Sequence, residues 1–233
     1  MAKILLLACQ PKTASTFLAN HLSLAGGGRT VSLVPGYDRR EQEISEFRIM
    51  RYRPRWYPVV VAQHHIRYSE ETGRLIKKYN LGVIVLTRDL FDAIASIRDH
   101  VRRESPVAPM MYLTSEMLAM SDSELEVFIA EFAIPWYLNF YMSWRRFEGA
   151  TFISYSDVVR DLDGTVSEIF KKHGLRAATA SKAPVKQAQV YRFNVGREGR
   201  GTEISPLARE IVVRKVERYT RFFQDSYLLS HLG

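Results

Sequence analysis

The sequence predicts an α/β fold in which helices cover both faces of a central parallel sheet. Short apolar runs rich in β-branched residues recur along the chain, and segments with helical periodicity lie between them. Strands that alternate with helices in this way are typical of parallel sheets, because each crossover connection needs a helix's length of chain. At 233 residues, 46% hydrophobic and 25% charged, the chain has the length and composition of a single globular domain, residues 1–233.

Five apolar runs are the predicted strands. None of them approaches the length needed to span a bilayer, so we expect no membrane span. A short polar loop follows the first run, and then an amphipathic segment begins at Phe17 and stops at three glycines. The predicted strands are Lys3–Cys9, Thr30–Val34, Pro58–Ala62, Gly82–Thr87 and Ala150–Ser154.

Two later helices are predicted from periodicity. In Asp89–Arg103 the apolar residues fall on one helical face. The segment Asp157–His173 has the same character and ends at Gly174, a residue typical of a helix C-terminus. We therefore expect each segment to form one helix.

Two further helices are predicted from their first residues. Ser121 and Glu124 have the spacing of a capping box at the start of a long helix. We expect Pro135 to kink or divide that helix, because proline lacks an N–H and clashes with the preceding turn. Ser205-Pro206 is a typical helix start, and the last helix should run from it towards Phe223.

The chain is basic and contains a single cysteine. Its 33 Lys and Arg against 25 Asp and Glu give a formal net charge of +8 at pH 7. This balance suits an anionic ligand, a nucleic acid, a polyanionic glycan or an acidic membrane surface, and charge alone does not choose among them. Cys9 cannot form an internal disulfide, and no signal-peptide pattern precedes it, so we expect a cytoplasmic protein.

The polar loop after the first predicted strand resembles a phosphate-binding turn. It reads Gln10-Pro11-Lys12-Thr13-Ala14-Ser15-Thr16 and joins a buried strand to a helix. Helix N-terminal N–H groups attract an anion, and Lys12 adds a positive charge. The loop lacks the glycines of the Walker A pattern, which disfavours a nucleoside triphosphate. An ordinary strand-to-helix turn with a Ser or Thr N-cap explains the same residues equally well.

Three more signals follow other predicted strands or lie near the C-terminus. Gln63-His64-His65 offers a histidine as a general base. Arg88, with Ser96 on the next predicted helix, can bind a second phosphate. The glycine-rich basic segment Arg192–Glu203 can wrap backbone N–H groups around a phosphate. Each signal also has a plain structural explanation: a packed histidine, an arginine paired with a neighbouring aspartate, and a surface loop.

In this order the signals resemble the sulfotransferases that use 3′-phosphoadenosine 5′-phosphosulfate (PAPS). The stretch PKTASTF is similar to the family's Pro-Lys-Ser-Gly-Thr-Thr-Trp loop, which binds the 5′-phosphosulfate. VIVLTRDLFDAIASIRDH resembles the family's 3′-phosphate segment, with Arg88 and Ser96 at the matching positions. FISYSDVVRDLDG is similar to its Tyr-Glu-Asp-Leu segment and would put Tyr155 beside the adenine. NVGREGRG resembles the closing Arg-Lys-Gly-x-x-Gly loop.

The resemblance implies a three-layer α/β sandwich like that of the P-loop NTPases, with PAPS as the sulfuryl donor and no required metal. It implies catalytic roles for Lys12 and for His65, which falls where the family's base lies. The implied acceptor carries a hydroxyl group and is a carbohydrate, a glycolipid or a small molecule. The implied donor-binding residues are Lys12, Thr13, Ala14, Ser15, Thr16, Phe17, Arg88, Ser96, Tyr155, Gly196, Arg197, Gly199 and Arg200.

The sequence departs from the family's pattern at several positions. Ala14 replaces the loop glycine, Phe17 the tryptophan, and Gln63 the lysine before the base. The segment Asn194-Val195 stands where the closing Arg-Lys is expected, so a neighbouring arginine would supply that charge. The base is His65 or, one residue earlier, His64. We expect the acceptor walls in Tyr37–Tyr57 and in the irregular segment Glu104–Met120.

Two other functions fit parts of the sequence. A P-loop-type nucleotide or small-molecule kinase would need a triphosphate cradle, and the missing glycines count against it. A non-enzymatic binder of nucleic acid or another polyanion is supported by the charge alone. We therefore expect a sulfotransferase without a nucleic-acid partner, and the oligomeric state, a homo-oligomer included, stays open.

Overall fold

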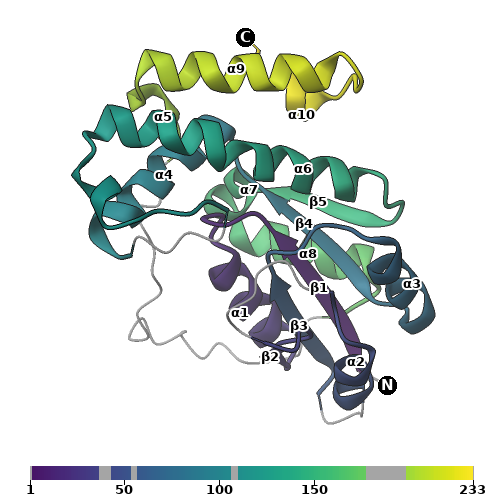
Figure 1. The fold of residues 1–233 in the computed structure, drawn as a ribbon. Coiled ribbons are helices and arrows are strands. Elements are labelled where there is room, and N and C mark those ends of the chain that lie inside the picture. The colour runs from purple at the N-terminus through teal and green to yellow at the C-terminus, as the bar shows by residue number, and fades with distance from the viewer. Residues whose placement is uncertain (1, 37–42, 54–56, 106–109, 177–197, 233) are drawn as a thin grey trace. The chain divides into compact units, whose positions relative to one another are not determined.

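A computed structural model describes residues 2–36, 43–53, 57–105, 110–176 and 198–232 of the chain. The described residues form a five-stranded sheet of order β2-β3-β1-β4-β5, in which all neighbouring strands are parallel (Figure 1). This confirms the predicted α/β fold. The strands are β1 (Lys3–Cys9), β2 (Arg29–Val31), β3 (Val59–His64), β4 (Gly82–Thr87) and β5 (Ala150–Ser154).

Three strands have the predicted bounds, and two differ. The second strand is shorter than the predicted Thr30–Val34 because the backbone of Leu33 bonds outside the sheet. Its N–H donates to the ring of His64, and its carbonyl accepts from the N–H of Ser45. The third strand extends beyond the predicted Pro58–Ala62, since His64 still pairs with β1.

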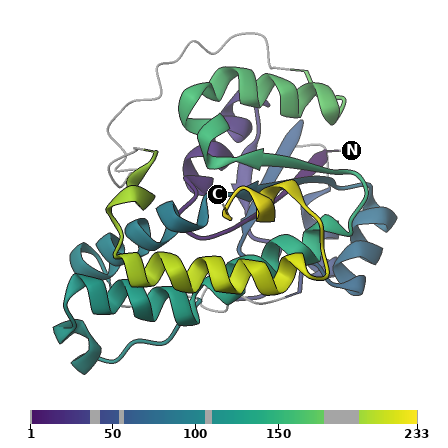
Figure 2. The same cartoon turned by 90° about the horizontal axis from the view of Figure 1, so that it is seen from above.

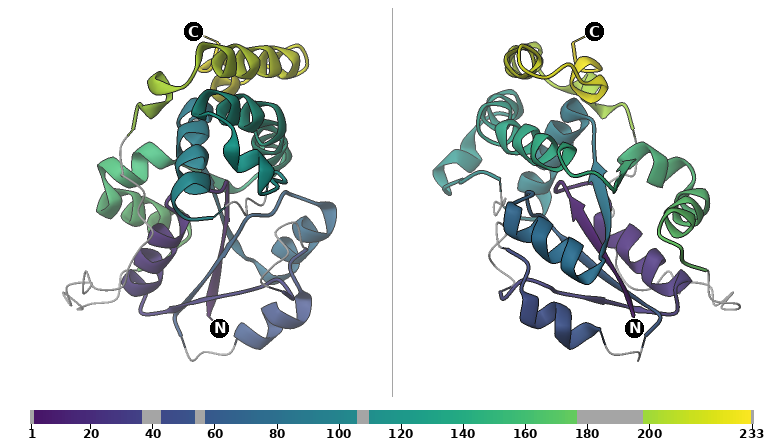
Figure 3. Two further views of the ribbon diagram at one scale, coloured as in Figure 1. Left: turned by 60° about the vertical axis from the view of Figure 1, so that its left-hand side comes forward. Right: turned by 90° about the vertical axis from the view of Figure 1, so that its right-hand side faces the viewer.

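The buried core of the sheet follows from the alternation of side chains along its strands. Leu5 and Leu7 of β1 share one buried cluster with Leu22 of α1 and Phe170 of α8. The helices α1 (Ser15–Ala25) and α8 (Leu162–Lys172) lie on that face, and α3 (Glu70–Tyr79) lies on the other (Figure 3). Helices therefore flank the sheet on both sides, as predicted.

Contacts within the chain divide it into two units. The first, Met1–Thr87 with Phe140–Phe193, contains the sheet. The second, Arg88–Asn139 with Asn194–Gly233, is helical in its described part. There α9 (Pro206–Thr220) lies along α5 (Asp122–Phe132), and Lys215 Nζ is 2.5 Å from Glu131 Oε2 (Figure 2). The expectation of a single domain stays a prediction.

Several predicted helix ends are confirmed. The Ser121–Glu124 capping box opens α5, and the long helix divides before α6 (Ile134–Arg145). Pro135 lies in the first turn of α6, where a missing N–H costs no helical hydrogen bond. Ser205 caps α9 through Ala208 N, at 3.4 Å.

The prediction of one helix over Asp157–His173 is wrong. The structure has α7 (Tyr155–Arg160) and then α8, and Asp161 separates them. Asp161 has an extended backbone with φ −147°, and its side chain accepts a hydrogen bond from Gly164 N at 2.9 Å. The side chain thus caps a new helix, which a periodicity pattern cannot reveal.

The remaining elements complete the described chain. Helix α4 begins after Asp89, whose side chain accepts from Asp92 N at 2.8 Å. None of the helices in the described part of the chain combines the length and hydropathy that a bilayer span requires. The remaining elements are α2 (Glu46–Tyr52), α4 (Leu90–Arg103), α10 (Ser226–Leu229) and the 3₁₀ turns η1 (Glu116–Ala119) and η2 (Arg200–Glu203).

Candidate functional site

The loop between β1 and α1 lies at the carboxyl end of the central strand. The chain leaves β1 towards β2 and β3, whereas it leaves β4 towards β5, so the topology reverses between β1 and β4. Open parallel sheets bind ligands at such a reversal. Gln10 N donates to Leu86 O at 3.0 Å, which fixes the start of the loop beside β4.

The backbone of this loop takes an unusual conformation for non-glycine residues. Lys12 and Ala14 both lie in the left-handed region, with φ of 60° and 55°. The Thr13 hydroxyl donates to Gln10 O at 2.6 Å and holds the turn. Turns of this kind direct successive N–H groups into a concavity that binds anions. Ala14, which stands at the position of the family's glycine, thus takes a conformation in which glycine would be less strained.

Helix α1 begins at this loop without a side-chain cap. Its N-cap is Ala14, and no acidic residue occupies the first turn. The alternative of an ordinary turn with a Ser or Thr N-cap therefore does not hold. A helix start without a side-chain cap or an acidic residue is typical of anion-binding helix termini, because its N–H groups and its positive dipole end attract negative charge.

Gln63 at the end of β3 links this loop to the histidines. Its Nε2 donates to Ser15 Oγ at 3.0 Å, and its Oε1 lies 3.5 Å from Thr16 Oγ1. The residue at the position of the family's lysine is thus an uncharged amide that connects the end of β3 to the first turn of α1. Nothing in the sequence pattern predicted this bridge.

His64 is a buried, neutral histidine. Its Nε2 accepts a hydrogen bond from Leu33 N at 2.9 Å, so the lone pair that a base would use is already engaged. Burial lowers the pKa of His64 to about 4, and the neighbouring His65 and Arg48 add to that shift. This side chain is poorly suited to accept a proton at neutral pH.

His65 has the opposite arrangement. Its Nδ1 lies 2.8 Å from the carbonyl oxygen of Cys9, which can only accept a hydrogen bond. Nδ1 therefore carries the ring proton, and Nε2 carries the lone pair that can take up a proton. The ring of His65 is thereby tied to the last residue of β1, and its role as the base stays a prediction.

A pocket of about 350 Å³ opens beside these groups. Thr16, Gln63 and His65 line it, together with residues of α1, of β2 and of the segment that follows β2. All of its lining residues belong to the first unit. The acceptor walls expected in Tyr37–Tyr57 and Glu104–Met120 are described only in part, since residues 37–42, 54–56 and 106–109 lie outside the described chain.

The second unit contains the residues predicted for the 3′-phosphate. Arg88 directly precedes the α4 cap, and Ser96 lies within α4; both are buried. The Tyr227 hydroxyl donates to Arg88 O at 2.8 Å. On α4, Ser96 shares one helical face with Asp92 and Asp99, four residues before it and three after it.

Asp92 holds the glycine-rich segment against α4. Its two carboxylate oxygens accept from Gly199 N at 3.0 Å and from Gly201 N at 2.6 Å. A Cβ added at Gly201 would lie 2.4 Å from Phe91 Cβ, so this close approach requires glycine. No sequence pattern predicted that Asp92 would accept hydrogen bonds from these two N–H groups.

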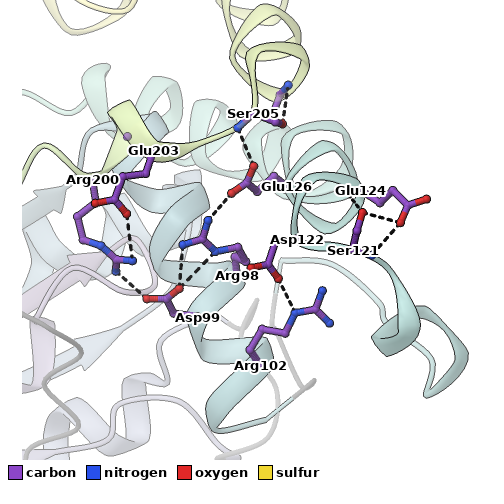
Figure 4. Close-up of polar contacts among 12 residues, drawn as sticks. Arg98, Asp99, Arg102, Ser121, Asp122, Glu124, Glu126, Arg200, Glu203 and Ser205 are labelled. Atoms are coloured by element: carbon purple, nitrogen blue, oxygen red, sulfur yellow. Dashed lines mark hydrogen bonds and ion pairs between the residues drawn. The ribbon is translucent and has the colours of Figure 1, made fainter.

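A largely buried ion network continues from that segment (Figure 4). Arg200 lies 2.7 Å from Asp99, which Arg98 also contacts, at 3.1 Å. Arg98 pairs with Glu126 at 2.5 Å, and Glu126 accepts from Ser205 N. Burial works to raise the pKa of Asp99, but the hydrogen bonds from Arg200 and Arg98 outweigh it and lower that pKa.

The structure divides the predicted site residues between the two units. Lys12, Thr13, Ala14, Ser15, Thr16, Phe17, His65 and Tyr155 belong to the first unit, and Arg88, Ser96, Gly199 and Arg200 to the second. Tyr155 is the buried first residue of α7, directly after β5. The predicted residues Gly196 and Arg197 lie outside the described residues. Within the described chain, no group of three His, Cys, Asp or Glu side chains is placed to bind a metal ion.

Comparison with solved structures identifies the fold. The mouse sulfotransferase SULT7A1, crystallised with PAP, matches with a TM-score of 0.64 and 13% identity over 95% of this chain and 85% of that one. A sulfotransferase from Alicyclobacillus acidocaldarius matches with a TM-score of 0.56 and 13% identity over 100% and 96%. No family model and no curated protein matches the sequence. The chain has the fold of these sulfotransferases.

Proposed function

We propose that the chain is a PAPS-dependent sulfotransferase that moves a sulfuryl group to a hydroxyl acceptor. One observation carries the proposal: a loop with an uncapped helix N-terminus and a histidine whose Nδ1 bonds to a backbone carbonyl meet at the last residue of β1. The loop starts at Gln10, and the His65 ring bonds to the Cys9 carbonyl beside it. The mouse structure with the same fold was crystallised with PAP, the desulfated donor, which supports the choice of nucleotide.

The first unit offers residues suited to the phosphosulfate. The N–H groups of the left-handed turn, the positive end of α1 and Lys12 together favour a multiply charged anion. We assign the 5′-phosphosulfate to Lys12 through Thr16, and the adenine to Phe17 and Tyr155. In the second unit we assign the 3′-phosphate to Arg88 and Ser96, and from the family resemblance we assign Gly196, Arg197, Gly199 and Arg200 to the donor as well.

Lys12 and His65 have complementary roles in the proposed reaction. A bond forms between the acceptor oxygen and sulfur, while the bond from sulfur to the bridging phosphate oxygen breaks and its electron pair leaves with the phosphate. Lys12 and the loop N–H groups stabilise the charge that develops on that oxygen. His65 Nε2 takes the acceptor's hydroxyl proton. The chain's residues thus supply charge stabilisation and proton transfer, and the scheme calls for no metal.

The acceptor is a carbohydrate, a glycolipid or a small molecule, and the cytoplasm stays the expected compartment. A kinase would need a glycine-rich cradle for a triphosphate, and the loop after β1 contains no glycine. The polyanion-binding alternative predicts binding that falls steeply with salt and ignores the nucleotide. Neither alternative assigns a role to the His65 ring that bonds to the Cys9 carbonyl.

Transfer from radiolabelled PAPS to a panel of hydroxyl compounds tests the proposal. His65→Gln should reduce transfer by about 10²–10⁴-fold, because a positioned general base contributes that much. The affinity for PAP should change little. His64→Gln is the matched control and should keep most of the activity. Loss of activity in the His64 variant alone would mean that His64, and not His65, is the base. Failure of the wild type to transfer to any acceptor would contradict the proposal.

A further inference from the structure

The pocket beside His65 has a lining that selects a particular chemistry. Among its described lining residues none is Asp, Glu, Lys or Arg, and none is Phe, Tyr or Trp. Apart from the imidazole rings of His64 and His65, the described lining therefore offers no side-chain counter-ion to an acidic group and no aromatic face for a flat phenol to stack on. Its volume of about 350 Å³ is at the lower end of the range for small-molecule sites.

Two polar side chains in the pocket have hydrogen-bonding capacity that the described protein does not use. Neither the Asn20 amide nor the Thr30 hydroxyl has a hydrogen-bond partner among the described residues. Ser32, by contrast, donates to Val34 O at 3.1 Å. An amide offers two donors and an acceptor, and a hydroxyl offers one donor and accepts as well. Groups of this kind match adjacent hydroxyls on one ligand.

Arg48 fixes the wall of the pocket without entering it. Its guanidinium donates to Ser32 O at 3.3 Å and to Pro35 O at 3.1 Å, and it is not among the lining residues. Arg48 lies in the segment where an acceptor wall is expected, and its guanidinium donates to these two backbone carbonyls. The bracing holds the segment after β2 in place before a ligand binds, which reduces the ordering cost of binding.

We infer that this pocket binds the acceptor and that the acceptor is a neutral, polyhydroxylated molecule of sugar-like chemistry; the inference rests on the proposed function. The pocket shares Thr16 with the phosphate-binding loop and includes the proposed base, His65. A hydroxyl of the bound molecule can therefore face the reacting groups while Asn20 and Thr30 bind its other hydroxyls.

Calorimetry on the complex with PAP, which cannot react, tests the inference with three probes. Methyl α-glucoside should bind at least tenfold more tightly than p-nitrophenol or glucuronate. Asn20→Leu and Thr30→Val should each raise the dissociation constant of the glucoside about fivefold, the worth of one neutral hydrogen bond. Both variants should leave the affinity for PAP unchanged.

Asn139→Leu is the control, because it makes the same change at an exposed residue outside the pocket lining, where it removes only the acceptor of the Tyr219 hydroxyl. It should leave all three probes unaffected. Tighter binding of the phenol or the uronate, or glucoside binding that ignores Asn20→Leu and Thr30→Val, would overturn the inference alone. Failure of the wild type to bind PAP would instead overturn the proposed function, and glucoside titrations without PAP would still test the pocket.

Discussion

The loop after β1 and the glycine-rich segment on α4 were both expected to bind phosphate, and the structure builds them in different ways. The loop joins two left-handed residues to a helix N-terminus that has no side-chain cap and no acidic residue in its first turn. The glycine-rich segment instead has Asp92 on its N–H groups and Asp99 beside its arginine.

The difference concerns what the positive groups of each region do, because they can attract a ligand or stabilise the fold. In the loop, a helix N-terminus without an acidic residue in its first turn stands beside Lys12 in the sequence, a combination that favours an incoming anion. In the segment, buried carboxylates already receive the donors, and the contacts stabilise the segment on α4. Changes in the loop should therefore act first on chemistry, and changes around the segment first on stability.

The largest expected effect is on the loop. Lys12→Ala should lower the rate of sulfuryl transfer by about 10²–10³-fold, the usual loss for one group that stabilises developing charge. The affinity for PAP should fall less, because the charge acts mainly on the leaving oxygen. Lys171→Ala, which removes an exposed lysine of α8, is the control and should behave like the wild type. Equal losses of rate and affinity in the Lys12 variant would make Lys12 a binding residue only.

His64, at the end of β3, and the carboxylates around the glycine-rich segment should also lose their contributions to stability in different pH ranges. The folded pKa of His64 is about 4 against an ordinary 6.5, so the unfolded chain binds a proton there that the folded chain does not. Stability is therefore lost as the pH falls from about 6.5 to 4, by about 3 kcal/mol. His64→Gln should remove this slope in urea unfolding measured at pH 7 and pH 4.5. An unchanged slope would mean that His64 titrates normally.

The carboxylates of the segment should act at lower pH. The pKa of Asp99 is lowered from its ordinary 3.8, so its contribution is present above that value and is lost as the pH falls through the folded pKa. Acid unfolding of wild-type protein should therefore show the His64 step first. A loss of stability confined to pH below 3.8 would contradict this order.

A smaller effect is expected from the Asp92 contacts. Asp92→Asn replaces a carboxylate that accepts two backbone N–H groups, and it should cost about 2 kcal/mol in urea unfolding, since hydrogen bonds to charged groups contribute about 1.5–3 kcal/mol. Glu203→Gln makes the same chemical change at an exposed residue 3.8 Å from Arg200 and should cost almost nothing. Equal stability of the two variants would show that the segment does not depend on Asp92.

Local signals in the sequence predicted much of the fold and part of the site. Apolar runs located β1, β4 and β5, and the Ser121 capping box and Pro135 located helix ends, because each is decided by neighbouring residues. The loop after β1 was recognised from its position between a strand and a helix.

Features that depend on distant partners could not be predicted. The N–H of Leu33, which lies 31 residues before His64, donates to the His64 ring and so distinguishes it from His65. Asp92 receives N–H groups from residues 107 and 109 positions later. The pocket likewise combines residues of α1, β2 and β3, which are distant from one another in the sequence.

Calorimetry with three nucleotides tests the central claim most directly. A site built for PAPS has donors for a 3′-phosphate, and the claim assigns them to Arg88 and Ser96. Two charge-assisted hydrogen bonds, at about 1.5–3 kcal/mol each, predict that PAP binds about a hundredfold or more tightly than AMP or ATP. Arg88→Ala should erase most of this preference. Equal affinity for PAP and AMP would contradict the claim, and tighter binding of ATP with Mg²⁺ would favour a kinase.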